Sequence, residues 1–322
     1  MLCEFVTTTT TTNRVREGLI PGPELLLLQA RSNAPGVRRL LGHLLAIFAT
    51  GSLYALALAR GESVLVEAVA MVTYGFTLVT MFAAMHETVH RTAFKSRRLN
   101  DAVSFFAGLL SFYNSSFYRP YHGFHHRFTQ IPGKDPELDD KRPTSFGAYL
   151  LELSGLPWWI GKVRTYYKLA LGQTESYPFL NDQNAALVVR SVRLQCSVYV
   201  AAQALSLWLG RPYFVLFWLL PVAAAQPLLR AILLAEHGGC TENDDGLSNT
   251  RTTHTVWPVR FLMWEMPYHA EHHLYPALPF FALAQAHDRV GPRLRYLARG
   301  YWGFNVRYIK AMSKRAMPKQ AA

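Results

Sequence analysis

Residues 64–90 read VLVEAVAMVTYGFTLVTMFAAMHETVH, an apolar run that ends in two histidines four residues apart. About 20 helical residues cross a hydrocarbon layer of about 30 Å, so the stretch 64–85 is long enough to be a transmembrane helix. Residues four apart on a helix project from one face. The sequence therefore predicts a membrane span with His86 and His90 just beyond its end, at one side of the membrane.

Three further apolar stretches, at 40–59, 194–210 and 212–235, have similar lengths. Only residues 60–63 separate the first two spans, and only residues 210–212 separate the last two. Such short turns join neighbouring antiparallel helices. The predicted fold class is therefore all-α and integral to the membrane, with four transmembrane helices in two hairpins and a cytosolic helical cap.

The remaining segments divide the chain into three parts. Residues 1–37 are expected to be a cytosolic N-terminal lead-in that is partly disordered, residues 38–290 one membrane domain, and residues 291–322 a basic cytosolic tail. Two aromatic-rich stretches between the hairpins, 102–118 and 146–160, are too short or too mixed to span the membrane. They are predicted as helices that lie in the membrane interface or dip part-way into the membrane.

Eight of the 12 histidines fall in three short windows. The windows contain His86 and His90, then His122, His125 and His126, then His269, His272 and His273. At this histidine frequency, one H-x-x-H-H occurs by chance in roughly one chain in sixty, and two occur in roughly one in ten thousand. An even number of spans brings all windows to the same side of the membrane. Titratable rings so close to a bilayer point to metal ions that bind their lone pairs.

Eight or nine neutral imidazoles are more than one tetrahedral zinc ion needs. They suit two metal ions with four or five ligands each and open positions for a reactant. Non-haem iron is the natural occupant for oxygen chemistry. Ligand type alone leaves the metal open, because the affinity order favours zinc over ferrous iron.

The net charge of +12 is explained if the chain is a membrane protein. Lys and Arg collect on the cytosolic side of the spans, and here they concentrate before the first span, after the second and in the C-terminal segment. Both termini and the metal site are therefore expected in the cytosol, at a bacterial-type inner membrane. Outside this membrane-flanking pattern there is no basic patch with interleaved aromatics, so nucleic-acid binding is not expected.

The windows resemble the histidine boxes of the membrane fatty acid desaturases, a superfamily that also holds alkane hydroxylases and carotenoid hydroxylases and ketolases. The resemblance runs through HETVHRTAF at 86–94, HHRFT at 125–129, DPE at 135–137, NTRTT at 249–253 and PYHAEHHLYP at 267–276. It implies two iron ions that activate dioxygen and remove two hydrogens from an alkyl chain. The implied metal ligands are His86, His90, His122, His125, His126, His237, His269, His272 and His273, with His237 as the single histidine after the fourth span.

The same resemblance implies a fatty acyl or other apolar substrate in contact with membrane lipids. The chain departs from acyl-CoA members at Leu233, where they carry an asparagine that reaches an iron through water. It has no H-P-G-G haem motif, so electrons are expected from a separate ferredoxin or cytochrome b5-like protein.

Several neighbouring residues have expected supporting roles. Four carboxylates are candidates to accept the second ring N–H of a ligating imidazole: Glu87, Asp135, Glu236 and Glu271. Three other histidines are expected in structural or surface roles: His43, His254 and His287. Arg230 is expected to snorkel to the membrane interface. Six aromatic residues are expected to be interfacial anchors, with an acyl tunnel as the alternative: Phe105, Phe106, Phe112, Tyr113, Phe117 and Tyr118.

Desaturation of an acyl chain is the leading functional hypothesis. A hydroxylase or ketolase of an alkyl or carotenoid substrate would use the same ligands, because the product depends on how the substrate sits. A membrane zinc hydrolase is an alternative from a different class, although it needs only three or four histidines and a bound water. A non-catalytic lipid-binding or metal-storage protein is the weakest alternative.

Overall fold

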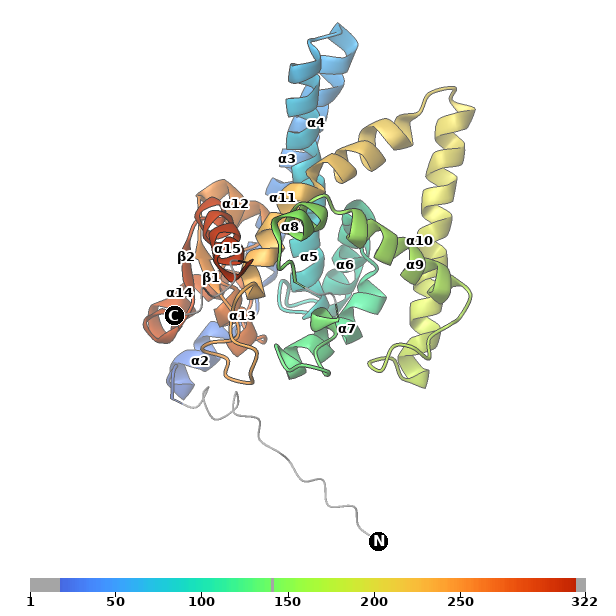
Figure 1. The fold of residues 1–322 in the computed structure, drawn as a ribbon. Coiled ribbons are helices and arrows are strands. Elements are labelled where there is room, and N and C mark those ends of the chain that lie inside the picture. Colours follow the sequence, from blue (N-terminus) through green and yellow to red (C-terminus); the bar gives the residue numbers. More distant parts are fainter. Residues whose placement is uncertain (1–17, 140–141, 317–322) are drawn as a thin grey trace.

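The computed structural model describes residues 18–139 and 142–316, and the described chain is mostly helical (Figure 1). Its longer helices are α2 (Gly22–Leu28), α3 (Asn33–Arg60), α4 (Val64–Val79), α5 (Met81–Val89), α6 (Arg97–Ser111), α7 (Ser115–Phe128), α8 (Phe146–Leu153), α9 (Leu156–Ala170), α10 (Asp182–Trp208), α11 (Leu220–His237), α12 (Trp257–Leu262), α13 (His269–Leu274), α14 (Leu283–Val290) and α15 (Tyr301–Ala316). The short elements are the 3₁₀ turns η1 (Pro136–Leu138), η3 (Phe280–Ala282) and η4 (Gly291–Arg293), the π-helical turn η2 (Val215–Leu219), and the strands β1 (Thr252–His254) and β2 (Leu297–Arg299).

Four helical segments are long and apolar enough to cross a membrane, which confirms the predicted number of spans. They are Asn33–Arg60, Val64–Val89, Asp182–Trp208 and Val215–His237. On the first of them, large apolar side chains such as Leu45 and Phe48 are exposed, as a hydrocarbon environment requires. The four-span, all-α prediction is therefore confirmed.

The boundaries of the spans differ from the prediction. The second span continues through α5 to Val89, so His86 lies inside the helix and not just beyond its end. The third span begins at Asp182, 12 residues before the predicted 194, because Asn181 and Asn184 form a capping box that starts the helix there. The helix tolerates Arg193 because its Nε donates to the carbonyl of Ala170 on α9.

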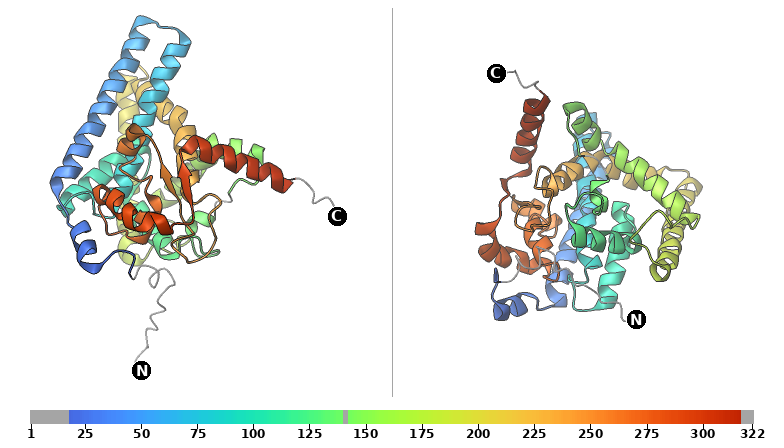
Figure 2. Two further views of the ribbon diagram at one scale, coloured as in Figure 1. Left: turned by 90° about the vertical axis from the view of Figure 1, so that its left-hand side faces the viewer. Right: turned by 60° about the horizontal axis from the view of Figure 1, so that its bottom comes forward.

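The two predicted hairpins differ in how their helices pack. The α3–α4 turn is tight: Gly61 ends α3 at φ +59, a left-handed conformation that glycine adopts without strain, and the Ser63 side chain caps α4. This hairpin projects from the helical body in Figure 1 and in the left view of Figure 2. In the second pair, α10 and α11 diverge from their turn, and α11 runs obliquely towards α4 (Figure 1).

The helices α4 and α11 meet at a small residue. A Cβ on Gly75 would lie 2.0 Å from the carbonyl oxygen of Pro221, so only glycine permits this approach. The contact brings the end of the second span beside the end of the fourth. Since α5 contains His86 and is followed by His90, and α11 ends at His237, this packing places their imidazoles close together.

Each interfacial stretch is broken into two helices. The stretch 102–118 divides at Phe112, which has φ +61, and α7 begins afresh where the side chain of Asn114 accepts the backbone N–H of Phe117. The stretch 146–160 divides at Gly155, with φ +71. The helices predicted in these stretches are therefore interrupted, because a left-handed residue lies between the two helices of each stretch.

The segment after α11 adds a small parallel sheet that the all-α prediction did not include. Thr252 pairs with Leu297 and His254 with Arg299. The following helix α15 packs on α11, where Phe304 contacts Ala235 in a small apolar cluster. The predicted tail 291–322 forms η4, β2 and α15 as far as Ala316. Of the predicted lead-in 1–37, residues 1–17 lie outside the described residues, and the rest includes α2 and the start of α3.

Candidate metal centre

Four helices bring the nine predicted histidines into one cluster. His86 lies on α5, with His90 just after it, and the second window lies along α7. His237 is the last residue of α11, and the third window begins α13. Spacings of three and four residues put each window on one helical face, as predicted, and the packing of α5, α7, α11 and α13 turns these faces towards each other.

Five imidazoles make the first group. One ring nitrogen from each lies within 4.8 Å of the others, and the residues are His86, His90, His122, His126 and His272. Within this group, Nε2 of His126 lies 2.9 Å from Nε2 of His122 and 3.1 Å from Nε2 of His272.

Four imidazoles make the second group. His125, His237 and His273 offer nitrogens within 4.8 Å of one another. His269 joins them, because its Nε2 lies 3.1 Å from Nε2 of His237 and 3.1 Å from Nε2 of His273. All nine histidines that the sequence indicated are therefore brought together.

The geometry of both groups fits bound metal ions. Nitrogens about 2.1 Å from a metal and at right angles to each other lie about 3 Å apart, which matches the spacing of the Nε2 pairs. Nε2 of His90 and both ring nitrogens of His86 are also buried with no hydrogen-bond partner among the described residues. Buried nitrogens without partners are expected where a metal takes the lone pair.

The surroundings keep these imidazoles in the neutral form that binds metals. Burial, with smaller effects of Arg119 and His125, lowers the pKa of His90 to about 3. Burial and the neighbouring imidazoles likewise lower the pKa of His122, His126, His269, His272 and His273 well below the usual value. At neutral pH these rings can coordinate a metal without first losing a proton.

His125 is held by a carboxylate, as one of the four carboxylate predictions stated. Its Nδ1 lies 2.8 Å from Asp135 Oδ1, and both side chains are buried. Although burial opposes protonation, Glu137 and Asp135 raise the pKa of His125. The contact fixes the ring so that its Nε2 faces the second group, in the manner of a carboxylate behind a metal-binding histidine.

Oxygen atoms of other residues orient three more rings. The backbone carbonyl of Asn249 lies 3.1 Å from Nδ1 of His237, and the Thr129 hydroxyl lies 3.1 Å from Nδ1 of His273. The Tyr118 hydroxyl lies 3.3 Å from Nδ1 of His122. The DPE and NTRTT stretches therefore lie beside the cluster and contribute to it through Asp135 and Asn249.

Two of the predicted carboxylates have other partners. Glu87 accepts hydrogen bonds from the Thr92 hydroxyl at 2.6 Å and the backbone N–H of Phe280 at 3.1 Å. Glu271 bonds to Thr252 and to His287, which is not one of the nine. These carboxylates fix the loops around the cluster and were wrongly predicted to support its imidazoles.

Two carboxylates instead face the nitrogens that point into the second group. Glu236 Oε2 lies 3.6 Å from Nε2 of His269, and Glu137 Oε2 lies 3.5 Å from Nε2 of His125. The other oxygen of Glu236, Oε1, is buried and has no hydrogen-bond partner among the described residues. The sequence pointed to Glu236 only as a support on the far side of a ring, and it did not single out Glu137.

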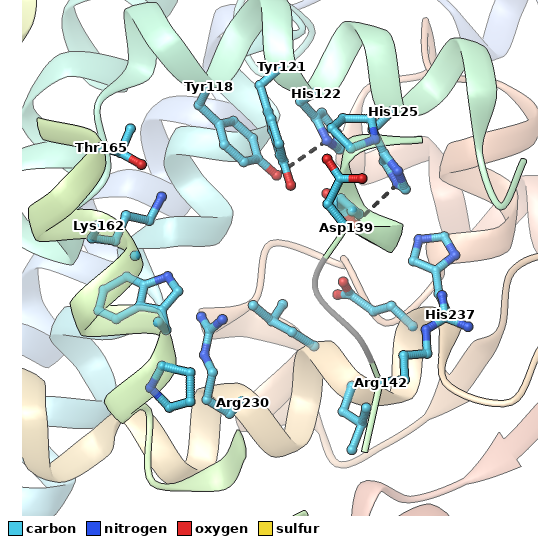
Figure 3. Close-up of a pocket in the computed structure, with 18 of the residues that line it drawn as sticks. Tyr118, Tyr121, His122, His125, Asp139, Arg142, Lys162, Thr165, Arg230 and His237 are labelled. Atoms are coloured by element: carbon cyan, nitrogen blue, oxygen red, sulfur yellow. Dashed lines mark hydrogen bonds and ion pairs between the residues drawn. The ribbon is translucent and has the colours of Figure 1, made fainter. Parts of the chain in front are cut away.

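A cavity of about 890 Å³ opens beside the second group. Its wall includes His125 and His237 at one end and Lys162 and Arg230 at the other (Figure 3). Of the predicted aromatic anchors, Tyr113, Phe117 and Tyr118 line this cavity, whereas Phe106 is exposed. A volume of this size is typical of small-molecule sites.

Arg230 does not snorkel, contrary to the prediction. It is buried, and its Nη2 donates to the Tyr113 hydroxyl at 2.9 Å. The other three histidines match their predicted structural or surface roles: His43 is buried between Thr77 and Trp264, His254 is exposed, and His287 bonds to Glu271.

The sequence matches the fatty acid desaturase family over residues 62–305, which holds every residue of the cluster. The chain belongs to this family. The membership confirms the resemblance seen in the histidine windows.

Three relatives are 26% or 27% identical to the chain over 216 to 233 residues. The chain is 26% identical over 233 residues to the sn-1 oleoyl-lipid 12-desaturase of Picosynechococcus sp., which is 67% of this chain and 66% of that protein. It is 27% identical over 216 residues to the dihydrorhizobitoxine desaturase of Bradyrhizobium elkanii, which is 62% of this chain and 61% of that protein. It is 26% identical over 228 residues to a Delta(5) fatty acid desaturase of Caenorhabditis elegans, which is 61% of this chain and 50% of that protein. The chain thus spans between half and two thirds of these relatives.

Proposed function

We propose that this protein is an oxygen-dependent desaturase that introduces a double bond into a fatty acyl or similar chain, with two iron ions held by the nine histidines. The observation that carries the proposal is the convergence of nine imidazoles, seven buried and two half-buried, in groups of five and four, beside a cavity of about 890 Å³. Bound iron would supply the redox chemistry by which dioxygen removes hydrogen from carbon.

The protein's own contribution is to place ligands, exclude water and position the chain. The first group would hold one iron with five imidazoles, and the second would hold the other with four. Tyr118 and Phe82 lie in the cavity wall beside His86, so an apolar chain in the cavity would meet the centre between aromatic rings. A rigid set of ligands then decides which carbons face the irons.

Glu236 would complete the second metal site. Its carboxylate faces His269, and the adjacent position on the same helix face is occupied by apolar Leu233, which cannot reach a metal through water. Replacing Glu236 by glutamine keeps the size but removes the negative charge. The second iron should then bind about 10- to 100-fold more weakly in competition with a chelator.

The matched control for this variant is Glu242→Gln, at an exposed carboxylate in the loop after α11. It should bind both irons like the parent. If Glu236→Gln also retained both irons at the parent affinity, Glu236 would not be a ligand.

Asp135 would act by holding His125. Besides accepting from His125, it accepts the backbone N–H of Gln130 at 2.7 Å and that of Glu137 at 2.9 Å. In Asp135→Asn one of these donors faces an amide NH₂, so the ring loses its fixed orientation. Turnover should fall about 10- to 100-fold, whereas Asp182→Asn, at the exposed start of α10, should leave it unchanged in the same assay.

Electrons would come from a separate ferredoxin or cytochrome b5-like protein at the cytosolic side of a bacterial-type inner membrane. The support for this orientation is the concentration of Lys and Arg in the segments that flank the spans. Membrane lipids would surround the exposed apolar faces of the spans.

The product distinguishes desaturation from hydroxylation at the same site. We expect reconstituted turnover with an acyl substrate and a reducing system to yield mainly a product that has lost two hydrogens, as measured by mass spectrometry. Two adjacent methylenes held towards the irons would both lose hydrogen before oxygen is transferred. A dominant gain of one oxygen would instead identify a hydroxylase, with the metal centre unchanged.

A further inference from the structure

Arg230 is a buried cation in the wall of the cavity (Figure 3). It lies on α11 within the fourth candidate span and is only 8% exposed. Its guanidinium carbon lies 5.1 Å from the centre of the Trp158 ring, and its Nη2 donates to Tyr113. Its Nε is buried and has no acceptor among the described residues.

Trp158 presents a second N–H of the same kind. Its indole Nε1 is also buried without an acceptor among the described residues, and the residue lines the same cavity. Buried donors are nearly always satisfied in folded proteins, because an unmade hydrogen bond there costs free energy. Two such donors on neighbouring side chains indicate that an acceptor from outside the chain binds between them.

The positive charge of Arg230 indicates that the acceptor is negatively charged. No carboxylate forms an ion pair with Arg230 in the part of the chain that the structure describes. The next carboxylate along α11, Glu236, faces His269 in the second metal group. Lys162 also lines the cavity, with its Nζ 4.0 Å from the centre of the Tyr113 ring. A buried cation in a membrane span usually pairs with an anion or with backbone carbonyls, and an anion compensates its charge.

We propose that Arg230 and Trp158 bind the anionic head group of the substrate, a carboxylate or a phosphate. This inference deepens the proposed function and rests on it for the identity of the bound molecule as the substrate. A guanidinium donates in a planar fork that matches the oxygens of both groups. The indole N–H supplies a further donor, and the aromatic rings of Tyr113 and Tyr118 continue the cavity towards the histidines.

The position of Arg230 relates the head group to the reacting carbons. Arg230 precedes His237 by seven residues, or about 10 Å along the helix axis. A chain anchored at Arg230 would therefore present carbons at a fixed distance from its head to the metal centre. The double bond should keep its position relative to the head group when the chain is lengthened at its far end.

The test is equilibrium binding to the metal-loaded full-length protein, in a neutral detergent and without reductant. The probes are hexadecanoic acid, its methyl ester and hexadecyl phosphate, which share one alkyl chain. At least one of the two anions should bind about 10-fold or more tightly than the ester, because charge-assisted hydrogen bonds are the strong ones. Preference for hexadecanoic acid would identify the head group as a carboxylate, and preference for hexadecyl phosphate would identify it as a phosphate.

Three variants test the two donors. Arg230→Gln should weaken binding of the preferred anion by about 10- to 100-fold and leave the ester unchanged. Trp158→Phe removes only the N–H and should weaken anion binding by about 3- to 10-fold. The matched control is Arg211→Gln, at an exposed arginine in the turn after α10, which should bind all probes like the parent.

Equal binding of acid, phosphate and ester by the parent would overturn the inference, and so would an anion preference that survives in Arg230→Gln. If Arg230→Gln bound less metal than the parent, its loss of anion binding could have another cause. The Trp158→Phe variant would then decide: unchanged anion binding in that variant would overturn the inference. The binding assay involves no turnover. An Arg230-dependent anion preference in a protein that forms no desaturated product would therefore support the head-group site and refute the proposed reaction.

Discussion

Alanine at His86 should reduce turnover by about 1000-fold or more, the scale expected when one member of a set that acts as a unit is removed. His86 is fully buried among the five imidazoles of the first group, and neither ring nitrogen makes a hydrogen bond with the described residues. The substitution therefore breaks no hydrogen bond of the fold in that part of the chain. Metal analysis should show the iron content falling from about two to about one per chain.

The control for this variant is His254→Ala. His254 lies in strand β1, its side chain is exposed, and it belongs to neither metal group. It should keep the iron content and turnover of the parent. Two irons per chain and normal turnover in His86→Ala would show that the first group does not hold a metal through His86.

The local part of the site was predictable from the sequence. Histidine spacings of three and four residues put rings on one helical face, and the apolar run before His86 located a span. Helical periodicity could not show that two such faces meet. That depends on contacts such as Gly75 against Pro221, which join segments far apart in the chain.

The wrong predictions share a physical reason. A long basic side chain near the end of a span usually snorkels, and the expected behaviour of Arg230 followed from that tendency. Its actual partners, Tyr113 and Trp158, come from the segments around α6 and α9, and only the folded chain brings them to α11. Likewise, Glu87 was assigned to an imidazole by sequence proximity, but Thr92 and the backbone N–H of Phe280 both donate to its Oε1.

The sequence contains residues that favour the two helix breaks, but the apolar stretches around them favour continuous helices. Asn114 is a favoured N-cap residue, and Gly155 readily adopts the left-handed conformation that ends a helix. Both breaks have consequences for the site. The first starts α7 at the register that turns His122 and His126 towards His86, and the second starts α9, which brings Trp158 to the cavity.

Removal of the metal should abolish turnover completely, and ferrous iron alone should restore it. Nine imidazoles offer enough nitrogen ligands for zinc as well, and the affinity order favours zinc over ferrous iron. Zinc should therefore bind to the chelator-treated protein and raise its thermal midpoint, because any metal that binds only the folded state stabilises it.

Zinc-loaded protein should nevertheless form no desaturated product, since zinc has no accessible redox change with which to reduce dioxygen. The decisive comparison measures three quantities on the same chelator-treated sample after loading with either metal: metal content, thermal midpoint and product by mass spectrometry. Equal metal content and a similar midpoint would exclude misfolding as the cause of inactivity. Formation of desaturated product by the zinc-loaded protein, with iron below the detection limit, would contradict the di-iron proposal. Hydrolysis of an ester or amide by that sample would favour the membrane zinc hydrolase instead.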